Sequence, residues 1–250
     1  MKKLLSILLL TAAISSPARA MVESDYDSDK PMALTTWYEP RSAAALEADR
    51  AYVKGMIPHH AGALTMSQQY LADPDAGSPT LKALARGIIR NQTFEIGVLN
   101  RIEREIDSPP NRFRFGPFNG SAQPVAQGDM IQNQRFMRSP IPGRFGIDPA
   151  TVTKRDVQFA KAMMIHHQAA VDMAREYHAN PAVKNNYLDL LNVDIILDQT
   201  QEIALMQDIV DAYRGDASAI RVDPSMVHGM GGMKHGGQSH AAMRASGHCH

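Results

Sequence analysis

The chain has 250 residues, and its 26 basic and 26 acidic side chains give a formal net charge of zero at pH 7. Because there is no basic excess, nothing in the charge favours nucleic acid or an anionic membrane as a partner. The lone cysteine, Cys249, excludes an internal disulfide framework. The length is sufficient for one substantial hydrophobic core.

The first twenty residues have the three parts of a bacterial-type signal peptide. Lys2 and Lys3 precede a short apolar run, and residues 18–20 (Ala-Arg-Ala) form a small-residue cleavage site. The apolar run is too short to span a bilayer, and no later segment is long enough. We therefore predict export to the periplasm or the cell exterior, with a mature chain that starts near Met21; a retained N-terminal anchor is the alternative.

The next segment predicts a helical hairpin. Residues 21–41 are polar and turn-rich, which favours a flexible lead-in, and Ser42 is a suitable N-cap for a long helix over Ala43–Ala72. Pro58 lies inside this helix, so we expect a kink just before a pair of histidines. After a loop at 73–80, a second helix is expected over about 81–106.

The second half of the chain predicts another hairpin, with helices over about 154–179 and 181–213. Between the halves, residues 107–153 are rich in proline, and a connection of this length is usually functional or mobile. Two helical hairpins joined by a long crossover predict an all-α, ferritin-like four-helix bundle over residues 42–213, with one repeat at 42–106 and the other at 154–213.

The two hairpins repeat each other at an offset of 107 residues, with about 19 identities over about 55 positions. On each first helix the paired histidines, the flanking methionines and a tyrosine fall on one face, which we expect to point inward. Imidazole and thioether at the same place in both halves indicate a site for a soft metal ion. The predicted ligands in the bundle are Met56, His59, His60, Met66, Met163, His166, His167 and Met173.

Each second helix places a glutamine and a glutamate on its inward face: Gln92 and Glu95, and Gln199 and Glu202. Buried carboxylates need partners, so these glutamates either fix the tautomer of a histidine or bind the metal themselves. The structural alternative is that the methionines are ordinary core residues, and that the histidines are buried without a ligand.

Residues 214–250 predict a flexible tail that lacks hydrophobic periodicity from Ser225 onward. Its interleaved soft and imidazole ligands suit Cu(I), and also Cu(II) or zinc. The predicted ligands here are His228, Met230, Met233, His235, His240, Met243, His248, Cys249 and His250.

A longer pattern in both halves resembles that of a known family. Asp-x-x-(Tyr/Phe)-x-x-x-Met-(Ile/Met)-x-His-His-x-x-Ala-x-x-Met runs from Asp49 to Met66 and again from Asp156 to Met173, followed each time by Gln-x-x-Glu. This resembles the ferritin-like family called domain of unknown function 305, and within it the exported copper-resistance proteins of cyanobacteria. The resemblance implies a helical bundle that binds Cu(I) and Ag(I) through the histidine and methionine positions. One departure is Ile165, which replaces the proline of the first repeat.

Three functions remain open from the sequence. The first is an exported protein that sequesters or transfers Cu(I), with Ag(I) and Cu(II) as alternatives and another copper-handling protein of the envelope as a partner; it would not be an enzyme. The second is a metal-dependent oxidase or ferroxidase, although the Glu-x-x-His motif of di-iron bundles does not occur at the histidine pairs. The third is a structural bundle whose histidines respond to pH.

Overall fold

The computed structural model describes residues 41–109, 111–122, 136–183 and 185–230. The predicted signal peptide, the lead-in up to residue 40 and the tail beyond residue 230 lie outside the described residues.

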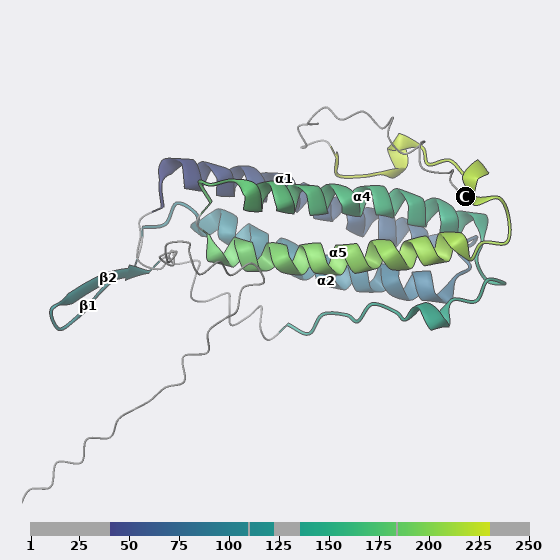
Figure 1. Cartoon of the computed structure of the whole chain (residues 1–250), viewed down its shortest axis with the longest axis horizontal. Coiled ribbons are helices and arrows are strands. Elements are labelled where there is room, and N and C mark those ends of the chain that lie inside the picture. Colours follow the sequence, from purple (N-terminus) through teal and green to yellow (C-terminus); the bar gives the residue numbers. More distant parts are fainter. Residues whose placement is uncertain (1–40, 110, 123–135, 184, 231–250) are drawn as a thin grey trace, which may run out of the picture. The chain divides into compact units, whose positions relative to one another are not determined.

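Four long helices make up the fold: α1 (Ala43–Ala72), α2 (Pro79–Glu105), α4 (Lys154–Ala179) and α5 (Asn186–Asp211). α1 packs against α2 and α4 against α5, and the two hairpins meet where α1 contacts α4 and α2 contacts α5. Figure 1 shows the four helices side by side, with α1 and α4 along its upper side. The predicted all-α bundle of two helical hairpins is confirmed.

Polar side chains at the helix starts satisfy free backbone donors. The Ser42 hydroxyl accepts from the amide of Ala45 at 3.1 Å, and Thr153 forms a capping box with Asp156. α1 continues through Pro58 as one helix. α5 starts later than the predicted Pro181, because Asn185 is the residue whose side chain caps the amide of Leu188.

The connection contains regular structure that the sequence analysis did not predict. Strands β1 (Asn111–Phe115) and β2 (Phe118–Ala122) pair antiparallel as a two-stranded hairpin, and a 3₁₀ turn, η1, covers Arg144–Gly146. Gly116 has a φ of 58°, a value that favours glycine in tight turns. Alternating Arg and Phe before this turn is the strand signal that was missed.

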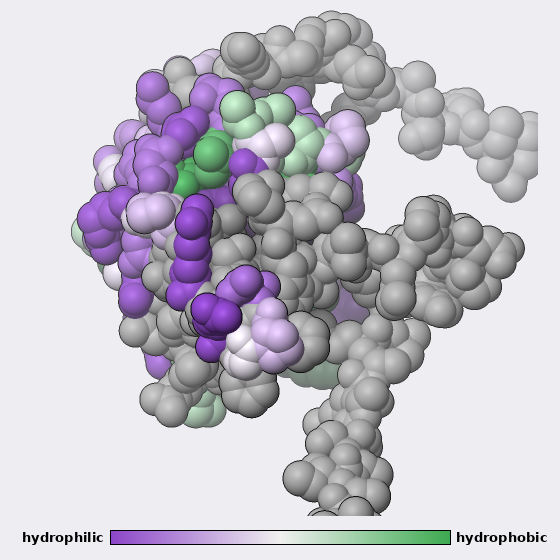
Figure 2. All heavy atoms as spheres, turned by 90° about the vertical axis from the view of Figure 1, so that its left-hand side faces the viewer, coloured by the Kyte–Doolittle hydropathy of each residue, from purple (hydrophilic) through white to green (hydrophobic). Residues whose placement is uncertain are grey.

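Two hydrophobic clusters fill the bundle and leave the histidines between them. Met56 on α1 and Ala170 on α4 belong to one cluster. Ala63 on α1 and Met163 on α4 belong to the other. On each helix, the histidine pair lies between the residue of one cluster and the residue of the other. The face of the molecule in Figure 2 is mostly hydrophilic where its residues are described, as expected when the apolar side chains are directed inward.

Residues 214–230 pack against the bundle, although composition predicted a flexible segment from residue 214. The 3₁₀ turns η2 (Ala217–Ala219) and η3 (Pro224–Met226) lie along this stretch, and Ile220 is buried in a core cluster. Isolated apolar residues such as Ile220 give no periodic signal, which explains why the packing was not predicted. None of the helices in the described ranges is long and apolar enough to cross a membrane.

Candidate metal centre

The four core histidines lie where α1 and α4 cross the middle of the bundle. His59, His60, His166 and His167 are all fully buried. The rings of His59 and His166 face each other with centroids 3.7 Å apart, and His166 Nε2 lies 3.0 Å from the backbone oxygen of His59. The approximate two-fold axis that relates the repeats therefore passes between His59 and His166.

A glutamate on the neighbouring helix holds the second histidine of each pair. His60 Nε2 lies 2.8 Å from Glu95 Oε2, and His167 Nε2 lies 2.6 Å from Glu202 Oε2. A carboxylate acceptor favours the tautomer with the proton on Nε2, which leaves a lone pair on Nδ1. This is the arrangement in which a carboxylate orients a metal-binding imidazole.

Several ring nitrogens of these histidines are buried without a hydrogen-bond partner among the described residues. Nδ1 of all four histidines, and also Nε2 of His59, find no hydrogen-bond partner within the described part of the chain. Buried polar atoms are normally paired, because an unpaired one costs about 1–3 kcal/mol. These five nitrogens make the histidine pairs the candidate ligand site of the described chain.

The two histidines at the axis are held in the neutral form. Burial is the main reason that the pKa of His59 lies far below its usual value, and the neighbouring imidazoles lower it further. Burial likewise lowers the pKa of His166, with smaller effects from His167, His60 and His228. Neutral imidazole is the form that binds metal ions, so these residues need lose no proton before they bind.

The methionines predicted as ligands surround the histidines but also belong to the hydrophobic core. Met56 and Met163 are fully buried, and Met66 is 3% exposed. Met173 is partly buried and fits against Gly55, where a Cβ atom would lie 3.0 Å from its terminal methyl carbon. Gln92 and Gln199 are buried at equivalent positions, and their side-chain amides lack partners among the described residues.

Imidazoles and carboxylates alone do not form a ready-made site. Within the described ranges, no group of three or more His, Cys, Asp or Glu side chains is placed to hold a metal ion. A metal at the histidine pairs would therefore need thioether ligands as well, or a small rotation of the rings. Mixed imidazole and thioether ligands are soft and neutral, and they favour Cu(I) or Ag(I) over hard cations.

Arg138, from the connection, breaks the symmetry of the two halves. Its guanidinium donates to Glu95 Oε1 at 2.5 Å and to Asp198 Oδ2 at 2.7 Å. Burial raises the pKa of Glu95, but the hydrogen bonds and charges of His60 and Arg138 outweigh burial, and the net pKa lies below its usual value. Glu95 therefore stays ionised to a lower pH than an isolated glutamate does.

Two of the predicted tail ligands fall within the described residues. His228 is partly buried, and it lines a pocket of about 260 Å³ together with Met66 and Met226. Met230 is also partly buried. The sequence analysis did not include Met226, although its position two residues before His228 is a signal that could have identified it. The other predicted tail ligands, Met233, His235, His240, Met243, His248, Cys249 and His250, lie outside the described residues.

The chain is similar to a curated protein and to a solved structure. An uncharacterized protein of Acanthamoeba polyphaga mimivirus is 38% identical over 73 residues, a match that covers 28% of this chain and 46% of that protein. The structure of CopM in the Cu(II)-bound form is 29% identical, with a TM-score of 0.43, and the match covers 64% of this chain and 93% of that one.

The family model described as domain of unknown function (DUF305) matches this chain twice, over residues 12–112 and 118–248. These two matches correspond to the two halves, each with its histidine pair and its glutamate. The chain belongs to the DUF305 family.

Proposed function

We propose that this protein binds Cu(I) between its two hairpins and acts in the sequestration or transfer of copper. The observation that carries the proposal is the set of buried, unpartnered imidazole nitrogens on α1 and α4, with two of the four rings oriented by glutamates. Soft imidazole and thioether ligands favour monovalent copper, and Ag(I) has the same preference.

The geometry supports a binding protein better than an oxidase. In di-iron bundles the carboxylates are ligands of the metal. Here Glu95 and Glu202 each direct one carboxylate oxygen to a histidine Nε2, which leaves thioethers and ring nitrogens to face the ion. We therefore propose that the protein is not an enzyme, and that it is exported and exchanges copper with another copper-handling protein.

An anaerobic Cu(I) titration against a chromogenic chelator tests the proposal. Residues beyond 223 carry further potential ligands, so the full chain is compared with a chain ending at Asp223, which keeps the four helices and η2 but removes Met226, His228 and the rest of the tail. We expect tight binding in both. In the shorter chain, the double variant His60→Gln and His167→Gln should lower the affinity more than about 100-fold, because loss of an orienting partner alone costs roughly 10–100-fold.

The variants are chosen to keep the fold. The glutamine amide can still donate to Glu95 and Glu202, and circular dichroism checks that the helices remain. His178→Gln is the matched control, because His178 lies on α4 but is partly exposed and away from the axis. Binding that survives in the double variant, or that disappears when the tail is removed, would contradict a site in the bundle.

A further inference from the structure

The start of the tail is seated directly on α1 beside the histidine pair. A Cβ atom added at Gly62 would lie 2.5 Å from the backbone oxygen of His228, so the absence of a side chain at Gly62 admits this backbone. Gly229, with a φ of 76°, lies against the backbone oxygens of Pro58 and His59. The oxygen of His59 is the same atom that His166 Nε2 contacts.

The segment is fixed by its own hydrogen bonds and by apolar contacts. Asp223 caps the turn by accepting from the amide of Ser225 at 2.8 Å, and its backbone oxygen accepts from the amide of Met226 at 2.9 Å. Met226 and Val227 pack against the core cluster that contains Met66. The side chains at 226 and 228 are therefore held at defined positions relative to α1.

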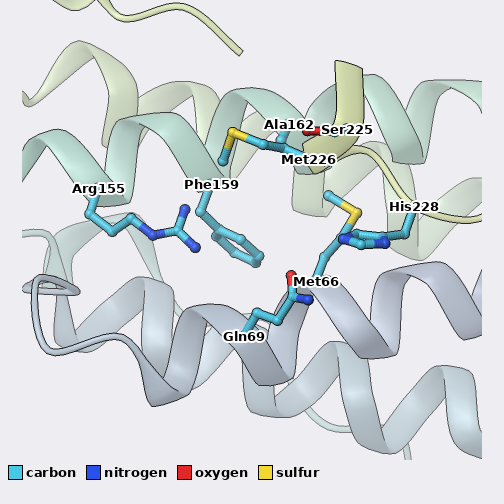
Figure 3. A pocket seen from close by; sticks show the side chains of 8 residues that line it. All are labelled: Met66, Gln69, Arg155, Phe159, Ala162, Ser225, Met226 and His228. Atoms are coloured by element: carbon cyan, nitrogen blue, oxygen red, sulfur yellow. The ribbon is translucent and has the colours of Figure 1, made fainter. Parts of the chain in front are cut away.

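These side chains complete a pocket at the junction of α1, α4 and the tail. Figure 3 shows Met66, Met226 and His228 around this space of about 260 Å³. None of the eight residues that line it is a carboxylate, so hard divalent cations find no anionic ligand there. Arg155 also lines the pocket, and its guanidinium forms an ion pair with Asp73 at 2.6 Å.

We infer that Met66, Met226 and His228 form a second site, which binds a monovalent soft ion where the tail meets the bundle. Two thioethers and one imidazole are a neutral, soft ligand set that suits Cu(I) and Ag(I). The choice of ion rests on the proposed function, but the pocket is lined by none of the four buried histidines. Because Gly229 lies on the backbone of His59, the segment that carries His228 lies next to the histidine pair of α1.

The test measures Ag(I) binding to the full chain by nuclear magnetic resonance. The methyl groups of its methionines are isotope-labelled, and each gives its own signal. Ag(I) is used because it does not change oxidation state. We expect the signals of Met66 and Met226 to shift together as Ag(I) is added. Met226→Leu, which keeps the volume, and His228→Gln should each weaken the response at Met66 by about tenfold or more.

Two glycine variants test the seating of the tail without removing a ligand. Gly62→Ala should displace the backbone of His228 and weaken the response at Met66 and Met226, while alanine favours the helix itself. Gly97→Ala is the matched control, because a Cβ atom there would meet nothing within 4 Å. Met137→Leu, at a highly exposed methionine, controls for the loss of one thioether.

The outcomes separate this site from the site in the bundle. Shifts at Met66 and Met226 without shifts at Met56 and Met163 would support the pocket and count against the buried centre. Shifts at Met56 and Met163 alone would overturn the pocket. An unchanged response of Met66 in Met226→Leu and His228→Gln would also overturn it, because these residues would then contribute no ligand.

Discussion

The buried histidines of the axis make the metal-free protein sensitive to acid. The pKa values of His59 and His166 are low in the folded state, so both stay neutral there, whereas the unfolded chain takes up protons below about pH 6.5. The stability that these residues contribute is therefore present above pH 6.5 and is lost as the pH falls. Asp198 offsets part of this loss, because burial raises its pKa to about 6 and it gains a proton in the folded state.

We expect the free energy of unfolding of the metal-free protein to fall by about 2 kcal/mol between pH 7.5 and pH 5.5. His59→Gln should reduce this fall by about two-thirds, because it removes about 1.4 kcal/mol of the proton-linked loss while the offset from Asp198 remains. Urea unfolding at the two pH values measures both. An unaltered fall in His59→Gln would contradict the assignment.

Sequence analysis predicted the inward face of each histidine pair but not the geometry at the axis. Helical periodicity placed the histidine pairs and both glutamates on inward faces, and it left two roles open for the glutamates. The structure shows the contact with a histidine, at His60 for Glu95 and at His167 for Glu202. The facing rings of His59 and His166 depend on how two helices distant in sequence cross. A periodic pattern within one helix contains no information about that crossing.

At the scale of elements, the described part of the connection between the hairpins contacts Glu95 but not Glu202. Phe136 stacks on Phe94 of α2 with centroids 3.8 Å apart, and the backbone amide of Ser139 donates to Asn91 at 2.8 Å. Between these contacts, Arg138 reaches Glu95. The sequence gives no signal for this arrangement, because the connection has no repeat and its proline content indicates only a loop.

Removing Arg138 should destabilise the protein. Arg138→Met removes a cation that compensates the charge of the buried Glu95, and we expect the free energy of unfolding to fall by about 2–3 kcal/mol. This is less than for a fully buried ion pair, because the Arg138 side chain is 21% exposed. Arg144→Met is the control from the same connection, since Arg144 is 69% exposed and pairs with Asp208 at the surface. Arg144→Met should lower the free energy of unfolding by less than about 1 kcal/mol. Equal losses in urea unfolding would show that the contact with Glu95 does not stabilise the fold.

At the scale of the whole molecule, two buried hydrogen bonds join the hairpins at opposite ends of α1 and α4. The hydroxyl of Tyr70, near the end of α1, donates to Asp156 at 2.6 Å, and the hydroxyl of Tyr177, near the end of α4, donates to Asp49 at 2.7 Å. α1 and α4 are therefore antiparallel, with the histidine pairs midway between these two contacts. The internal repeat made these residues equivalent, but it did not predict that each tyrosine pairs with the aspartate of the other half.

These crossed hydrogen bonds should determine how firmly the hairpins hold the histidines together. Burial, together with the neighbouring aspartate, raises the pKa of both tyrosines far above its usual value, so each remains a donor at neutral pH. Tyr70→Phe and Tyr177→Phe should each lower the free energy of unfolding by about 1–3 kcal/mol, because each leaves a buried carboxylate with one donor fewer.

Because the two contacts lie at opposite ends of the helices and share no partner, their losses should add in the double variant. Urea unfolding measures this, with Tyr213→Phe, at a partly exposed tyrosine, as a control that should change stability by less than about 0.5 kcal/mol. A double variant no less stable than either single one would mean that the hairpins do not depend on the two contacts independently. The additive result would instead mean that the two ends of the α1–α4 interface hold the hairpins together independently of each other.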